Sequence, residues 1–354
     1  MRRVRGLALV VMLAAELAQA AAPATVVPTE GAGEGERLFK TRCRGCHISR
    51  PPGEGDLLAV EGSEAPDLSY AGARLRPEWL ENWLAAPVRL RPAGWLPYRY
   101  VVPTAEGDRV DVARLPAHLA LSLGEARAVV SYLSTLKRES NPYPVAGPNE
   151  SIRAQVHFFK LLPCGGCHQA RPGVGGVSGP ELYTAGARLD PEWMSAFISE
   201  PGYWQQGLMP RSDARSDQVA AIVQFLVQQP TAAPAVQAPA APPVAVAAVP
   251  EPKGRAQRLY RLLCSQCHGV LGNGRGLNAR HLFVAPRNHR SRQEMGGLTR
   301  DSVIAAIRSG GMAVGKSSQM PAWGSVLGRE DTELLADYVL TLSGESASPG
   351  DRSP

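Results

Sequence analysis

All six cysteines of this 354-residue chain fall inside three short runs of one pattern, Cys-x-x-Cys-His. The runs cover residues 43–47, 164–168 and 264–268. Two thiols three positions apart at the end of a helix can each reach one vinyl group of a porphyrin, and the histidine after them then lies beneath the iron. The spacing therefore predicts three covalently bound haem c groups. The attaching thiols would be those of Cys43, Cys46, Cys164, Cys167, Cys264 and Cys267, and the proximal iron ligands would be His47, His168 and His268.

Disulfides and structural zinc are the competing uses of such cysteine pairs. In an exported protein, an isolated Cys-x-x-Cys pair more often forms a disulfide. Structural zinc takes four ligands, whereas each run supplies three. Three runs that use every cysteine and all end in histidine favour haem over both alternatives.

The first 20 residues have the layout of an export signal. Three arginines among the first five residues precede an apolar stretch, residues 7–15, and the small residues Ala18 and Ala20 follow it. We expect cleavage after Ala20 and a periplasmic location. An uncleaved anchor is the alternative, but the stretch is far shorter than the roughly 20 residues that span a bilayer. No later segment is long enough, so we expect no membrane span after cleavage.

One segment of the chain is repeated. Residues 66–79 return as residues 180–193, and both copies contain Ala-Gly-Ala-Arg-Leu followed by Pro-Glu-Trp. Each copy follows a Cys-x-x-Cys-His run and precedes a segment with apolar residues at helical spacing. A third unit has the same order of parts without this segment. The chain therefore contains a tandem pair of units and a third unit.

A stretch made almost only of Ala, Pro, Val and Gln separates the pair from the third unit. Such a stretch cannot bury a core, and we expect a semi-rigid spacer that leaves the third unit more independent. The predicted organisation is a signal peptide at 1–20, a first unit at 21–140, a second unit at 141–230, the spacer at 231–252, a third unit at 253–343 and a tail at 344–354.

Each unit begins with an amphipathic helical pattern that leads into its cysteine pair, and each ends with another. Only 6% of the residues are aromatic, which leaves little side-chain mass to fill cores of this size. Aromatic residues of the first and last helical patterns could meet where the two helices cross. The aromatic pairs are Phe39 with Tyr132, Phe159 with Phe225, and Tyr260 with Tyr338.

On these motifs, each unit resembles a class I cytochrome c domain, and the chain resembles the tandem multihaem c-type cytochromes of bacterial respiratory chains. The resemblance implies an all-α fold of three small haem domains, the last tethered by the Ala/Pro-rich linker. It also implies a methionine as sixth iron ligand. Met320, followed by Pro321, is similar to the family's methionine loop, and Met209 stands in the same place in the second unit. Met312 competes with Met320 but lacks the following proline.

The first unit departs from this pattern. Its position equivalent to Met209 is Leu96, and no methionine lies between His47 and His168. Residues 98–117 form an insertion that brings His118 to the start of the last helix. Three outcomes remain open for the first iron: bis-histidine ligation by His118, which would lower the potential, a five-coordinate iron, or a ligand from outside the domain. We expect the remaining histidines, His157, His281 and His289, to be solvated.

The resemblance also implies contacts around each haem. Proximal histidines donate their second ring N–H to a proline carbonyl in the family, and Pro66, Pro180 and Pro286 match that position. Family domains use arginine and aromatic donors for the haem propionates. The matching candidates are Arg74, Trp79, Arg188 and Trp193, although the tryptophans could equally serve helix packing.

The formal net charge is +6, and arginines gather around the third attachment site. We expect this face to steer an acidic redox partner onto the third unit. A solvated face without a partner is the alternative. Nucleic-acid binding is disfavoured because the arginines are interleaved with a haem motif in an exported chain. The cluster consists of Arg255, Arg258, Arg261, Arg275, Arg280, Arg287, Arg290 and Arg292.

These observations predict an exported electron carrier that passes single electrons between a donor and an acceptor protein. No catalytic acid or base beside the first haem is legible in the sequence. Two other functions stay open. The first haem, lacking methionine, could bind a small molecule in an enzyme, or the chain could be the cytochrome subunit of a membrane-associated dehydrogenase.

Overall fold

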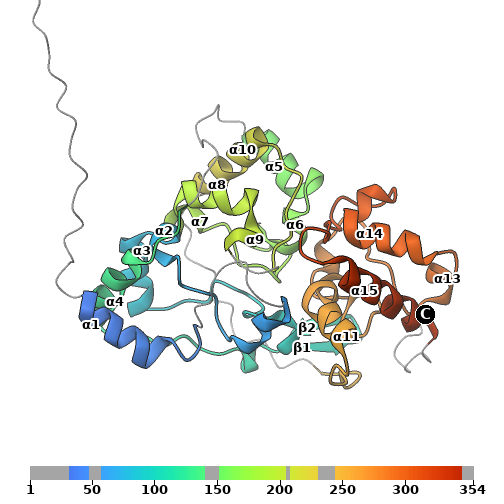
Figure 1. The fold of residues 1–354 in the computed structure, drawn as a ribbon, viewed down its shortest axis with the longest axis horizontal. Coiled ribbons are helices and arrows are strands. Elements are labelled where there is room, and N and C mark those ends of the chain that lie inside the picture. The colour runs from blue at the N-terminus through green and yellow to red at the C-terminus, as the bar shows by residue number, and fades with distance from the viewer. Residues whose placement is uncertain (1–31, 48–56, 140–150, 205–207, 230–243, 345–354) are drawn as a thin grey trace, which may run out of the picture.

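The computed structural model describes residues 32–47, 57–139, 151–204, 208–229 and 244–344. Within these ranges, helices form almost all of the regular structure, and three helical groups follow one another along the chain (Figure 1). Two short antiparallel hairpins are additions to the predicted all-α fold. The predicted signal peptide, most of the spacer and nearly all of the tail lie outside the described residues.

The first group carries helices on both sides of an irregular segment. Ser122 and Glu125 form a reciprocal capping box at the start of its last helix. The helices are α1 (Ala32–Leu38), α2 (Ala71–Arg74), α3 (Pro77–Ala85) and α4 (Leu123–Thr135), a π-helical turn follows α1 (Phe39–Cys43), and short 3-10 turns cover Leu57–Gly62, Pro97–Arg99 and Val112–Arg114. Strands β1 (Val101–Thr104) and β2 (Gly107–Val110) form a hairpin inside the predicted insertion, with Val101 opposite Val110.

The second group repeats this order. Asp190 caps its longest central helix, and Pro191 occupies the first helical position, where proline is pre-organised. The helices are α5 (Ser151–Val156), α6 (Cys164–Cys167), α7 (Ala185–Arg188), α8 (Pro191–Ser199), α9 (Pro201–Trp204) and α10 (Ser216–Val227), with a π-helical turn at His157–Leu161. Strands β3 (Gln169–Arg171) and β4 (Val174–Gly175) form the second hairpin.

The third group is also helical. It contains α11 (Arg255–Leu259), a π-helical turn (Tyr260–Cys264), α12 (Ser265–His268), α13 (Arg292–Met295), α14 (Arg300–Ala313) and α15 (Arg329–Thr341), with 3-10 turns at Ala279–His281 and Leu342–Gly344. In all three groups, a π-helical turn thus joins the first helix to the cysteine motif. Such turns are rare and occur frequently at functional sites.

The first and last helices of each group pack together, as the aromatic pairs predict. The ring centroids of Phe39 and Tyr132 lie 5.5 Å apart, and those of Tyr260 and Tyr338 also lie 5.5 Å apart. In the second group the prediction is wrong by one residue. Phe158, not its neighbour Phe159, faces Phe225, at 6.2 Å. The π-helical turn that contains both phenylalanines changes the helical phase, which a strict 3.6-residue period does not anticipate.

The two copies of the repeated segment contact each other. Leu75 and Leu189 form an isolated antiparallel bridge. On either side, the Arg76 N–H donates to the Arg188 carbonyl and the Asp190 N–H donates to the Arg74 carbonyl, both at 3.0 Å. The contact is therefore reciprocal, and it joins the first and second groups through equivalent residues.

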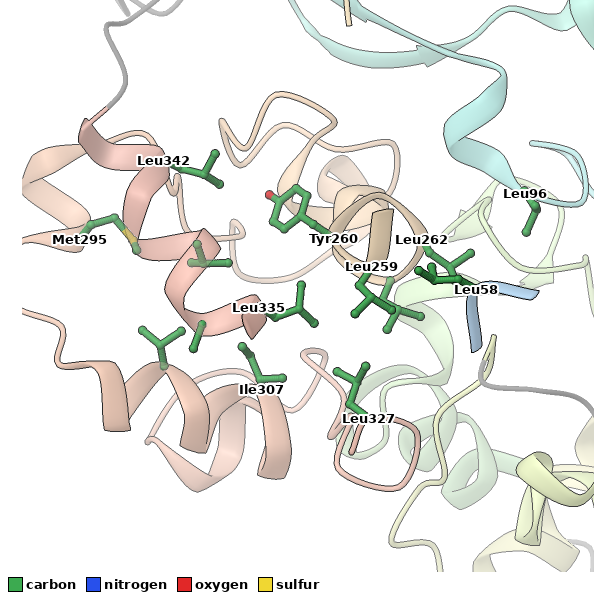
Figure 2. Packing of buried hydrophobic residues seen from close by; sticks show 14 of the residues in the cluster. Leu58, Leu96, Leu259, Tyr260, Leu262, Met295, Ile307, Leu327, Leu335 and Leu342 are labelled. Atoms are coloured by element: carbon green, nitrogen blue, oxygen red, sulfur yellow. The ribbon is translucent and has the colours of Figure 1, made fainter. Parts of the chain in front are cut away.

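The expectation of a more independent third unit is wrong. Its buried cluster includes Leu58 and Leu96 of the first unit, which lie at the end of the cluster nearest Leu262 (Figure 2). The Arg258 Nε donates to a Glu61 carboxylate oxygen at 2.7 Å. The described end of the spacer is also attached, because the Val246 N–H donates to a carbonyl of β1 at 3.0 Å. The composition of the spacer could not predict these contacts, because they are made mostly by residues of the units before and after it.

Hairpin β1–β2 forms part of this junction. In Figure 1 it reaches from the first group toward α11. Its Asp108 is 4% exposed, donates its backbone N–H to the Arg275 carbonyl and accepts the Val270 N–H on its carboxylate, both at 2.8 Å. The inserted segment of the first unit therefore attaches directly to the loop that follows the third cysteine motif.

The buried Asp108 carboxyl predicts a pH effect on stability. Burial raises the pKa of Asp108 to about 7, and the hydrogen bond from Val270 opposes this rise. Between about pH 4 and 7 the folded chain keeps a proton that the unfolded chain has released, so this contribution to stability falls as pH rises through that window. We expect Asp108→Asn to be more stable than the original protein at pH 8 by about 2–4 kcal/mol in urea unfolding, with no difference near pH 4.

A control variant lies in the same hairpin. Glu106→Gln removes the same charge from an exposed position, and we expect it to leave this pH window unchanged. Parallel pH profiles for the original protein and Asp108→Asn would contradict a protonated carboxyl at this contact.

Candidate haem sites

The three Cys-x-x-Cys-His runs share one local geometry. In each unit a helix and a π-helical turn lead into the motif, the turn ending at Cys43 and Cys264 in two units and just before Cys164 in the other, and all six cysteines carry free thiols. His47 Nδ1 lies 2.8 Å from the Pro66 carbonyl oxygen, and His168 Nδ1 lies 2.9 Å from that of Pro180. With Nδ1–H donating, Nε2 is the nitrogen left to bind a metal. The predicted proline contacts are therefore present in the first and second units.

In the third unit the acceptor is the next residue. His268 Nδ1 lies 3.0 Å from the carbonyl oxygen of Arg287, so the prediction of Pro286 is wrong by one position. The role of this carbonyl is unchanged, because any backbone oxygen can accept the N–H and fix the tautomer.

The second and third motifs open into one cavity of about 630 Å³. Its wall includes both proximal histidines and both methionines that follow the family pattern. Cavities of this size are typical of cofactor sites, which are mostly apolar with a few polar groups. The chain residues contributed by the two motifs and their loops are Cys164, Cys167, His168, Met209, Cys264, Cys267, His268 and Met320.

Asn278 joins these two motifs. Its side-chain oxygen accepts the Val177 N–H at 2.9 Å and the Ser178 N–H at 3.2 Å, and its amide nitrogen donates to Ser178 Oγ at 2.7 Å. Its own backbone N–H donates to the Gln266 carbonyl, inside the third motif, at 2.7 Å. Asn278 is fully buried, so these bonds are shielded from water. One residue therefore fixes the second attachment site relative to the third.

The two candidate methionines of the third unit differ in position. Met320 lines the cavity, and its loop is attached to α14 through the Gly311 N–H, which donates to the Met320 carbonyl at 3.0 Å. The turn at Gly310 has φ +77°, a conformation that favours glycine, and a Cβ there would lie 2.9 Å from the same carbonyl. Met312 is 68% exposed instead. Of these two residues of the third unit, only Met320 is part of the cavity wall.

At the first site, His118 lies close to the proximal histidine. The ring centroids of His47 and His118 are 6.2 Å apart, and the rings are tilted by 58°. Imidazole nitrogens bind metals at about 2.0 Å, so these two rings could hold one metal ion between them if both Nε2 atoms turned toward it. His118 is exposed, its ring packs on Trp83 at 4.5 Å, and its Nδ1 lies 2.8 Å from the Leu119 carbonyl oxygen, which leaves Nε2 available.

Leu96, the first unit's equivalent of Met209, is a core residue of the neighbouring third unit. It is 1% exposed and packs in the core of the third unit, where Trp95 accompanies it. Both residues line the cavity of the second and third sites. The segment of the first unit that is equivalent to the methionine segment of the second unit therefore packs around the second and third sites.

The predicted propionate donors divide in the same way. Arg74, Arg188 and Trp193 line the shared cavity, but Trp79 stacks on Trp83 at 5.8 Å and is not part of the cavity wall. Two buried polar atoms have no hydrogen-bond partner within the described part of the chain, and they are Arg74 Nε and Trp193 Nε1. Buried donors without partners are rare, and each needs an explanation. An anionic ligand in the cavity supplies one, so these residues fit a haem with its carboxylates.

Two histidines expected in solvent are buried. His289 is 7% exposed, stacks on His268 at 4.2 Å and lies 3.2 Å from the Tyr260 hydroxyl. Burial lowers the pKa of His289 well below its usual value, so it packs as a neutral ring. His157 is 6% exposed and contacts the Gln218 amide at 3.2 Å. The residues next to each histidine in the sequence are basic or helical and suggest exposure, whereas the groups that bury the two rings come from distant parts of the chain.

Several arginines of the predicted docking face already have partners in the protein. Arg255 pairs with Asp331 across α11 and α15, and Arg258 pairs with Glu61 of the first unit. Arg275 donates to a carbonyl of the β1–β2 turn at 3.2 Å. Part of the cluster therefore holds the units together.

Among the helices that the structure describes, none is both long enough and apolar enough to cross a bilayer.

Comparison with known proteins gives one family match. Residues 252–339 match the family described as cytochrome C oxidase, cbb3-type, subunit III, and this segment contains the third motif and Met320. No curated protein and no solved structure matches the chain. The family match supports a c-type cytochrome, a haem protein of electron transfer with covalently bound haem c.

Proposed function

We propose that this chain is an exported trihaem c-type cytochrome that passes single electrons between two redox partner proteins. The observation that carries the proposal is the common geometry of three Cys-x-x-Cys-His runs, each with its histidine Nδ1 directed at a backbone carbonyl. Only the third run lies in the segment matched to a known family. The first two runs have the same contacts, which supports the same cofactor in each.

The ligands of the chain set the proposed order of potentials. Bound haem supplies a one-electron couple at its iron. A thioether ligand raises the potential relative to a second imidazole. Met209 and Met320 therefore give the second and third sites higher potentials, whereas His118 gives the first site a lower one. Electrons enter at the first unit in this proposal and leave from the shared cavity.

The shared cavity supports direct exchange between the second and third sites. Gly166 of the second motif faces the third unit, since a Cβ there would lie 3.3 Å from Leu282 and 3.5 Å from the Gln319 carbonyl. Asn278 holds the two motifs at this separation. The attachment sites therefore lie against each other with few residues between them.

The proposal includes a periplasmic location and an acidic partner that docks on the third unit. Its arginines around residues 280–292 flank the loop that bears the His268 contact. Positive charge beside a redox site speeds encounter with an acidic protein at low salt. An enzyme that binds a small molecule at an open first iron is the competing function, and the position of His118 opposes it.

Haem counting tests the proposal. In a host with haem-ligating machinery, the protein should carry three haem masses, and serine substitution of either the 43/46, the 164/167 or the 264/267 cysteine pair should remove one. Each variant should also lose the corresponding share of the reduced alpha-band absorbance. The three variants serve as controls for one another, because each should lose only its own haem. A wild-type mass with one or two haems would reject the trihaem function.

A further inference from the structure

Three arginine side chains converge on one wall of the cavity, and the charges of two of them, Arg91 and Arg188, act on His168. Arg74, Arg91 and Arg188 all line the cavity, and their charges act on one another. Burial, with the charges of Arg74 and Arg188, lowers the pKa of Arg91 to about 9. Guanidinium groups gathered at a buried site are costly unless anions compensate them.

The three arginines come from two different units. Arg188 ends α7 of the second unit, whereas Arg74 ends α2 of the first unit and Arg91 follows α3. Backbone hydrogen bonds hold both residues of the first unit in place. The Asp190 N–H donates to the Arg74 carbonyl at 3.0 Å, and the Glu181 N–H donates to the Leu90 carbonyl, next to Arg91, at 2.9 Å. The first unit therefore forms one side of the second haem site.

Aromatic rings orient the two side chains from the first unit. The Arg74 guanidinium lies 5.1 Å from the centroid of the Trp193 ring, and that of Arg91 lies 4.7 Å from the Trp95 ring. Cation–π contacts of this kind hold a guanidinium in place without neutralising its charge. Both groups thus keep their charge available to a ligand.

The positive charge of this group is only partly compensated. Arg188 has Glu181, whose carboxylate lies 3.6 Å from its Nε, and both side chains are almost fully buried. Arg74 and Arg91 form no ion pair within the described part of the chain. Two positive charges remain, and the Arg74 Nε and Trp193 Nε1 donors remain unsatisfied beside them. The cavity therefore calls for a ligand with two negative charges at this wall.

A haem has two propionates, which match this requirement in number and charge. We infer that these three arginines, with the indole N–H of Trp193, bind both propionates of the second haem. The inference rests on the proposed function, and it makes the second haem site incomplete without the first unit. Arg91 has no equivalent in the repeat and was not predicted from the sequence. The arrangement also assigns Arg74 to the haem of the neighbouring unit.

Redox titration of the full haem-loaded chain tests the inference. Arg91→Gln should lower one of three midpoint potentials by about a tenfold change in the reduction equilibrium, about 59 mV for one electron, because a compensating charge is lost. A propionate without its partner should also bind a proton on reduction, so that this potential becomes pH-dependent between pH 5 and 8. The other titratable groups facing the arginines are Tyr70, Tyr183, Glu181, His168 and, beside Arg74, His47.

The matched control is Arg89→Gln. Arg89 lies two positions before Arg91, is exposed, and loses the same charge in this variant. We expect all three potentials to stay as in the original protein. A shift of equal size in Arg89→Gln, or a shift in Arg91→Gln that is the same at every pH, would overturn the inference because neither requires a bound carboxylate.

Arg91→Lys covers the case in which Arg91→Gln fails to load the second haem. Lysine keeps the charge, so we expect three haems and potentials close to the original ones. If the lysine variant also lacks a haem, Arg91 has a structural role and the inference is wrong. The haem count of the unsubstituted protein separates the two proposals. Three haems with unchanged potentials in Arg91→Gln reject the inference alone, and fewer than three haems in the unsubstituted protein reject the proposed function.

Discussion

In the proposed trihaem protein, replacement of His118 by alanine should convert the first iron from a six-coordinate to a five-coordinate centre. The His47 and His118 ring centroids lie 6.2 Å apart, close enough for both imidazoles to hold one iron. Without the second imidazole, the reduced iron should bind carbon monoxide rapidly and the oxidised iron should bind cyanide. Paramagnetic resonance should show one high-spin signal in place of one low-spin signal, and the other two irons should not change.

His118→Met provides a second measurement on the same site. A thioether in place of the imidazole should raise the potential of the first iron, since His/Met ligation has a higher potential than bis-histidine ligation. The control is His281→Ala, which removes a partly exposed histidine of the third unit. Three unchanged low-spin signals in His118→Ala would remove His118 from the ligand set and favour a ligand from outside the unit.

Asn278→Ala should weaken the junction between the second and third units. The change leaves the buried N–H of Val177 and the half-buried N–H of Ser178 without an acceptor and removes the donor to Ser178 Oγ. Each buried donor left unsatisfied costs about 1–3 kcal/mol, so we expect a loss of about 2–4 kcal/mol in the free energy of unfolding. Urea unfolding followed at the haem bands would measure it.

The same variant should slow electron exchange between the second and third sites, because their separation is no longer fixed. Asn273→Ala is the control, since Asn273 accepts the Arg275 N–H within the third unit. It should cost much less and leave the exchange rate unchanged. Equal losses of stability in both variants would contradict a special role for Asn278 at the junction.

Local patterns predict much of each site. The Cys-x-x-Cys-His spacing and the helical periodicity before it locate the three motifs, and the positions of Pro66 and Pro180 predict the histidine contacts. Met320 could be distinguished from Met312 by the proline that follows it, and exposure of Met312 agrees. These features depend on residues close together in the sequence, where spacing determines geometry.

Contacts between units were not predictable in this way. Arg91, Asp108 and Asn278 each act on a unit other than their own, and no periodicity or motif marks them. For Leu96 the sequence shows only that methionine is missing where the second unit has Met209, and it does not indicate that Leu96 packs in the third unit. The spacer suggested separation because its composition cannot form a core, but the units contact each other through residues on either side of it. The place of His118 as an iron ligand stays a prediction.

The reciprocal contact between the repeated segments has the form of a two-fold symmetric interface. Equivalent residues meet at Leu75 and Leu189, and each copy donates one backbone N–H to the other. Identical subunits of a homodimer associate through self-complementary surfaces of this kind. Joining both halves in one polypeptide makes the association intramolecular, with an effective concentration of about millimolar.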